Sequence, residues 1–169
     1  PTGLSWGSSG LLIENTTNAT NSNWKRNNLP WTSSPLVPNT SYSFQAKARN
    51  GDGIETDYGP SASKYTRANL PGKSSFSDVT RTSIRANWTA NDNPGGTEYQ
   101  CQNVTTGVKS DWTTDTSWNS DNLTCGISYS FRVKARNGDG VETAWTSLGS
   151  QSTAKCILLL TPNGGEMIP

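Results

Sequence analysis

The chain has 169 residues, with 14 lysines and arginines, 13 aspartates and glutamates, and no histidine. The lack of histidine removes the commonest general base and metal ligand, and the balanced, scattered charge lacks the basic stripe of a nucleic-acid-binding protein. No apolar run approaches the roughly 18 residues of a membrane span, so we expect no membrane span. The charge balance and the lack of histidine lead us to expect no nucleic acid partner, metal or cofactor.

Two segments of the chain repeat almost residue for residue. Residues 41–53 read SYSFQAKARNGDG and residues 128–140 read SYSFRVKARNGDG, 87 positions apart. Residues 22–24 (SNW) match residues 110–112 (SDW) at an offset of 88. Self-similarity of this kind indicates a tandem duplication.

Alternating side chains predict the secondary structure. Residues 42–49, 83–88 and 129–136 alternate apolar and polar side chains, which is typical of half-buried antiparallel strands. Asn-Gly-Asp-Gly follows at 50–53 and 137–140 and supplies residues that tolerate positive φ in turns. No stretch shows helical apolar spacing, so the sequence predicts an all-β chain.

Each copy also carries the marks of one domain family. Trp6 and Trp88 would each close a second strand, and residues 36–42 (LVPNTSY) have the form Leu-x-Pro-x-Thr-x-Tyr. Residues 123–129 (LTCGISY) fit that form with Cys for Pro and Ile for Thr. These features resemble the fibronectin type III domain. The resemblance implies two tandem antiparallel Ig-like β-sandwiches, the first lacking its A strand. We expect the structural core to include Trp6, Trp31, Leu36, Tyr42, Trp88, Trp118, Leu123 and Tyr129.

The same resemblance divides the chain. We expect a truncated domain at 1–68, a Pro- and Gly-containing linker at 69–72, and a complete domain at 73–156. In the tail at 157–169, residues 161–166 (TPNGGE) resemble the opening of Ig-like modules in large bacterial surface proteins. We therefore expect this chain to be a piece of a multidomain extracellular array.

The three cysteines allow more than one pairing. Cys125 would precede strand F and Cys156 would end strand G, so a Cys125–Cys156 disulfide would suit a secreted domain and leave Cys101 free. The alternatives are a Cys101–Cys125 pair or three reduced thiols.

Other candidate sites have plain structural alternatives. Trp112, Trp145 and Tyr58 could form an exposed carbohydrate platform, or could cover a thin core. The Asn-Gly-Asp-Gly loops offer too few carboxylates for a calcium site and read as turns. Sequons occur at Asn15, Asn18, Asn39, Asn87, Asn103 and Asn122, as expected by chance in a chain rich in Asn, Ser and Thr. No recurring nucleophile, base or carboxylate pair predicts catalysis.

We therefore expect a non-enzymatic structural or adhesive module of an extracellular or cell-surface protein. Its F–G loops, which the resemblance places at residues 50–53 and 137–140, are the expected contact surfaces. Its partners would be other protein chains or neighbouring copies, as in a filament or surface layer. An apolar tail could donate a strand to the next copy; this tail consists of Ile157, Leu158, Leu159 and Leu160. The alternative is a carbohydrate-binding accessory module of a secreted polysaccharide-degrading enzyme.

Overall fold

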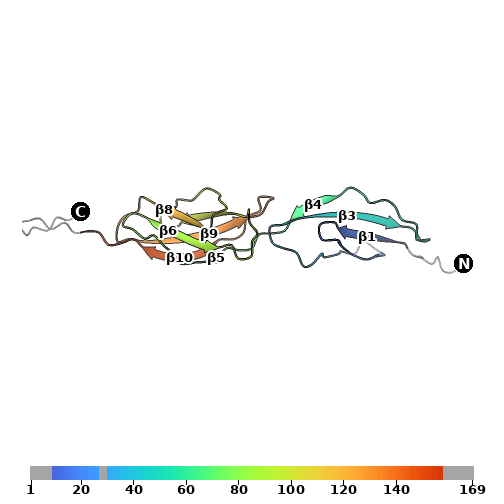
Figure 1. Cartoon of the computed structure of the whole chain (residues 1–169), viewed down its shortest axis with the longest axis horizontal. Coiled ribbons are helices and arrows are strands. Elements are labelled where there is room, and N and C mark those ends of the chain that lie inside the picture. The colour runs from blue at the N-terminus through green and yellow to red at the C-terminus, as the bar shows by residue number, and fades with distance from the viewer. Residues whose placement is uncertain (1–8, 27–29, 158–169) are drawn as a thin grey trace, which may run out of the picture. The chain divides into compact units, whose positions relative to one another are not determined.

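The computed structural model describes residues 9–26 and 30–157 and confirms the predicted all-β fold (Figure 1). The strands are β1 Gly10–Asn15, β2 Thr20–Asn21, β3 Ser41–Arg49, β4 Ala62–Tyr65, β5 Gly72–Lys73, β6 Ile84–Thr89, β7 Glu98–Asn103, β8 Ser117–Ser120, β9 Ser128–Arg136 and β10 Thr146–Ser152. They form three antiparallel sheets, in the orders β2-β1-β3-β4, β10-β9-β7 and β5-β6-β8. Over the described ranges, no helix is long and apolar enough to cross a membrane.

Contacts divide the chain into two compact units. Unit 1 comprises Pro1–Arg67 with Asn137–Val141, and unit 2 comprises Ala68–Arg136 with Glu142–Pro169. Residues predicted as a linker belong to unit 2, because Gly72 begins β5 and the Asn69 N–H donates to Asn93 Oδ1 at 2.7 Å. Between β5 and β6, Ser77 makes an isolated bridge to Arg85.

Unit 2 has a closed core between its two sheets. On β6 the burial alternates strictly, and Ile84, Ala86 and Trp88 face inward with at most 3% of their surface exposed. The inward side chains of β7, β9 and β10 meet them: Tyr99, Cys101, Phe131, Val133, Ala135 and Leu148. Aromatic rings fill the middle of this core, since the Trp88 and Tyr99 centroids lie 6.1 Å apart.

Unit 1 is much less well filled. Of its described residues, Tyr42 is the one buried hydrophobic side chain, at 6% exposure. Phe44, the counterpart of the buried Phe131, is half-buried and packs edge-on against Trp31 with a centroid separation of 6.3 Å. Within residues 9–26 and 30–67, which are the described residues of the first copy, no strand corresponds to β5 of unit 2.

Some predicted core positions lie at the rim instead. Trp31, Leu36 and Trp118 are half-buried, and Trp31 lies outside any strand. Trp118, on β8, pairs with the inward-facing Ala86 and packs against the unit 2 core, yet its ring is only partly covered. By contrast, Tyr42, Trp88, Leu123 and Tyr129 are buried, and Trp6 lies outside the described residues.

Both units share two polar devices that fix the sheets. The Tyr42 hydroxyl accepts the Val37 N–H at 2.9 Å, and the Tyr129 hydroxyl accepts the Thr124 N–H at 2.8 Å. These bonds attach each corner to the strand that follows, as the family resemblance implies.

The second device is a pair of asparagines with no exposed surface. Asn15 Nδ2 donates to Ser33 Oγ at 3.0 Å, and Asn103 Nδ2 donates to Ser120 Oγ at 3.2 Å. Buried polar groups need such partners, so two of the six sequons are internal structural positions.

The burial difference predicts unequal costs for matched substitutions. Phe131→Ala should lower the free energy of unfolding of unit 2 by about 3–5 kcal/mol, because it empties a closed core. Phe44→Ala should cost less, since its ring is already half-exposed. Hydrogen-exchange mass spectrometry reports the two units separately, and equal losses of protection would contradict this packing.

Candidate functional site on the outer sheet faces

The outer face of β9 carries three cations in a row. Because strand side chains alternate, Arg132, Lys134 and Arg136 lie opposite the face that buries Phe131 and Val133. Lys134 is nevertheless only 9% exposed, so its ammonium group needs partners close at hand.

Two tryptophan rings supply these partners. The Trp145 ring lies 4.4 Å from the Arg132 guanidinium and 4.8 Å from Lys134 Nζ. The Trp112 ring lies 5.2 Å from Lys134 Nζ and 4.4 Å from the Arg136 guanidinium. Cations and rings therefore alternate along the sheet, and we call these five residues the unit 2 ladder.

Acids and an amide complete the charges of the unit 2 ladder. Arg136 Nε donates to Glu98 Oε2 at 2.6 Å, and this bond raises the pKa of Arg136. Lys134 Nζ pairs with Glu142 Oε2, and Arg132 Nε donates to Gln102 Oε1 at 2.8 Å. Each cation thus has both an aromatic face and a polar acceptor.

Unit 1 repeats this arrangement on β3 with fewer cations. Arg49 lies 4.4 Å from the Trp24 ring, while Lys47 Nζ lies 5.8 Å from Trp24 and 4.8 Å from the Tyr58 ring. Lys47 Nζ also pairs with Glu55 Oε2 at 2.6 Å, which raises the pKa of Lys47. We call Lys47, Arg49, Trp24 and Tyr58 the unit 1 ladder.

One end of the unit 1 ladder lacks an acid. Glu98 faces Arg136 across the strands of unit 2, whereas Gly10 faces Arg49 across β1 and β3. Arg49 Nε is buried and has no hydrogen-bond partner among the residues that the structure describes. The first ladder is therefore less well satisfied than the second, which matches its thinner core.

The other end of the unit 1 ladder is capped by a carboxylate. Gln45 occupies the place of Arg132, and its Nε2 donates to Glu14 Oε2 at 2.8 Å. This bond, together with the Tyr58 hydroxyl, holds the pKa of Glu14 below its usual value. Glu14 in turn raises the pKa of Tyr58. In unit 2 the Arg132 guanidinium lies against the Trp145 ring. In unit 1 the neutral, hydrogen-bonded side chain of Gln45 takes the place of that cation.

All three side chains predicted as a carbohydrate platform lie in these ladders. Trp112 and Trp145 are half-buried and share Lys134 between them, and Tyr58 is 38% exposed. Their rings contact the cations of β3 and β9. From the sequence, the lysines and arginines of these strands are expected only to face solvent. The signal for the ladders is the spacing of these cations by two residues, together with aromatic residues at repeated positions.

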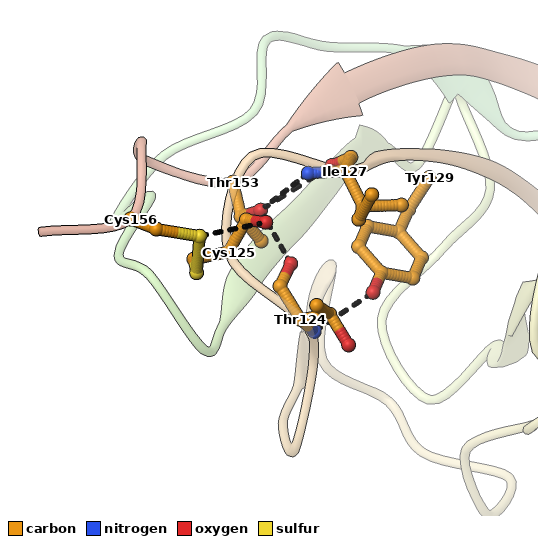
Figure 2. The surroundings of a disulfide bond; sticks show 6 residues. All are labelled: Thr124, Cys125, Ile127, Tyr129, Thr153 and Cys156. Atoms are coloured by element: carbon orange, nitrogen blue, oxygen red, sulfur yellow. Dashed lines mark hydrogen bonds between the residues drawn. A yellow bond between two sulfur atoms is a disulfide. The ribbon is translucent and has the colours of Figure 1, made fainter. Parts of the chain in front are cut away.

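A disulfide lies at one pole of unit 2 (Figure 2). Cys125 and Cys156 are joined, with Cα atoms 5.1 Å apart, and Cys101 is a buried free thiol, so the Cys101–Cys125 alternative is wrong. Thr153 fixes the same pole, because its hydroxyl donates to the Thr124 carbonyl at 2.7 Å. Ile157 beyond the bridge is 63% exposed; the rest of the predicted donor tail, Leu158, Leu159 and Leu160, lies outside the described residues.

The Asn-Gly-Asp-Gly loops are turns, as predicted. Asn50 Oδ1 accepts the N–H groups of Asp52 and Ile54 at 3.0 and 2.9 Å, which closes the loop on itself. Across the part of the chain that the structure describes, no three His, Cys, Asp or Glu side chains gather where they could hold a metal ion.

Comparisons with known proteins agree with this architecture. Residues 69–148 match the family model described as fibronectin type III domain. A two fibronectin type III domain segment from chicken tenascin is 18% identical with a TM-score of 0.53, and the match covers 90% of this chain and 87% of that one. The FN1–FN3 domains of chicken CNTN1 are 17% identical with a TM-score of 0.42, over 88% of this chain and 56% of that one. No curated protein sequence matches.

The unit 2 ladder predicts a stability cost for its central cation. Lys134→Met should lower the free energy of unfolding of unit 2 by about 1–3 kcal/mol, because it removes two cation–π contacts and leaves Glu142 without its partner. Lys47→Met should cost less, as Lys47 is the more exposed of the two. Urea unfolding followed by tryptophan fluorescence measures both, and a neutral Lys134→Met would contradict a stabilising ladder.

We predict that the free cysteine, Cys101, does not react with thiol reagents in the native chain. Burial raises the pKa of Cys101 to about 12, so the side chain stays a neutral thiol at ordinary pH and does not supply the reactive thiolate. Titration with a thiol-specific reagent should detect no thiol in the native chain and one in denaturant without reductant. A native chain that reacts at once would show that Cys101 is accessible.

Proposed function

We propose that this chain is a non-enzymatic structural and adhesive segment of an extracellular or cell-surface protein. The observation that carries the proposal is the duplicated ladder. In both units the large rings and cations that could serve a ligand contact one another instead, along the outer face of the main sheet. Side chains in that arrangement stiffen a module and leave its loops as the variable contact surfaces.

Two features support an extracellular location. Residues 69–148 form a fibronectin type III domain, a kind of domain typical of extracellular structural and adhesive proteins. The Cys125–Cys156 bridge is of a kind that persists in oxidising compartments. We propose that the module stands in a longer array and that residues 161–166 open a further Ig-like module.

Exposed apolar side chains at the loops favour protein partners. Ile54 follows the F–G turn of unit 1 and is 68% exposed, and Val37 beside the corner of Tyr42 is 51% exposed. Exposed apolar side chains such as these can contact other protein chains or neighbouring copies of the same module, as in a filament or surface layer.

The location can be tested on the source organism. An antibody against the chain should label intact cells or the culture medium, and protease treatment of intact cells should remove the cell-bound signal. Signal that appears only after cells are opened would contradict the proposal.

The carbohydrate alternative makes an opposite prediction for binding. We expect neither the wild-type chain nor the Trp145→Ala variant to be retained on insoluble polysaccharides, because that ring contacts Arg132 and Lys134. Wild-type retention that Trp145→Ala abolishes, with Trp118→Ala as the matched control, would support the carbohydrate-binding role instead.

A further inference from the structure

The two F–G loops hold the same reactive pair of residues. Residues 48–53 and 135–140 both read ARNGDG, so Asn50-Gly51 and Asn137-Gly138 have the same neighbours. Glycine lacks a Cβ, so its amide nitrogen can approach the side chain of the preceding asparagine without steric hindrance. Attack of that nitrogen on the asparagine Cγ is the route by which asparagine loses ammonia.

Each asparagine side chain is held in a way that would assist this attack. Asn50 Oδ1 accepts two backbone N–H groups, from Asp52 at 3.0 Å and Ile54 at 2.9 Å. Asn137 Oδ1 accepts the equivalent groups of Asp139 at 3.1 Å and Val141 at 2.8 Å. Two donors at this distance stabilise the negative charge that develops on the oxygen as the nitrogen attacks.

Accessibility separates the two sites. Asn50, Gly51 and Asp52 are all exposed, and among the described residues the Gly51 N–H donates no hydrogen bond. Asn137 is only 5% exposed. The nucleophile at Asn50 can therefore be deprotonated by solvent, whereas the reaction at Asn137 must wait for the loop to open.

We propose that Asn50 is a site of spontaneous covalent modification, distinct from and independent of the adhesive role. The deprotonated Gly51 nitrogen bonds to Asn50 Cγ, and Nδ2 leaves as ammonia to give a five-membered imide. Water then opens the imide at either carbonyl carbon, which yields aspartate or isoaspartate. The net change is the uptake of one water and the release of one ammonia, with no oxidant or cofactor.

The product would alter the loop. In isoaspartate the main chain runs through the side-chain carbonyl carbon, so the oxygen that held the Asp52 and Ile54 N–H groups is no longer placed to accept them. The F–G loop of unit 1 would loosen and gain a negative charge next to the exposed Ile54. Conversion would therefore mark the age of the molecule at one exposed loop.

The test compares the two asparagines within one molecule. The full chain is incubated at physiological temperature and mildly alkaline pH, and peptide mapping separates the asparagine, aspartate and isoaspartate forms at each site. In the folded chain, Asn50 should convert about tenfold or more faster than Asn137, because only Asn137 must first become exposed. In the chain unfolded in urea with its disulfide reduced, the two rates should be equal.

A variant separates the proposed chemistry from general instability. Gly51→Ala requires no positive φ, since Gly51 is not among the residues with that backbone angle, and it should slow conversion at Asn50 while leaving Asn137 unchanged. Equal or reversed rates in the folded chain would overturn the proposal. So would an Asn50 that stays intact while the unfolded chain converts, because the two donors would then protect the side chain.

Discussion

The alternation of cations and aromatic rings along β9 and β3 is the constraint on which the rest of the structure depends. Each cation lies against one or two rings on the outside of a sheet whose other face must be apolar, so the register of the central strand is fixed from both sides. A slip of one residue would place Lys134 in the core and Phe131 in water. The ladder therefore specifies the fold as well as stabilising it.

This arrangement explains how a chain with only 31% hydrophobic residues can fold. In unit 2 the rings and aliphatics of a closed core are backed by a complete ladder, a disulfide and a tyrosine corner. In unit 1 the described core reduces to Tyr42 with half-buried neighbours, and no described acid partners Arg49 as Glu98 partners Arg136. The two copies share the same arrangement of core and ladder, and both are more complete in unit 2 than in the described part of unit 1.

Much of this could be predicted from the sequence. Period-two alternation located β3, β6 and β9, and the corner motif pointed to Tyr42 and Tyr129 because their spacing is local and repeated. The ladders were missed because they join residues from separate strands, and no local pattern shows which tryptophan meets which lysine. Trp31 and Trp118 are less buried than their repeated positions predict. A position within the repeat does not say how much of a side chain its neighbours cover.

The most direct test of the ladder is solution NMR of its cation side chains. Aromatic ring currents should move the methylene protons of Lys134, Arg132 and Arg136 well upfield of their values in an unfolded peptide. The shifts should be smaller for Lys47, because one of its two rings lies farther away. Methylene shifts at unfolded-peptide values in unit 2 would contradict the claim that these cations lie against the tryptophan rings.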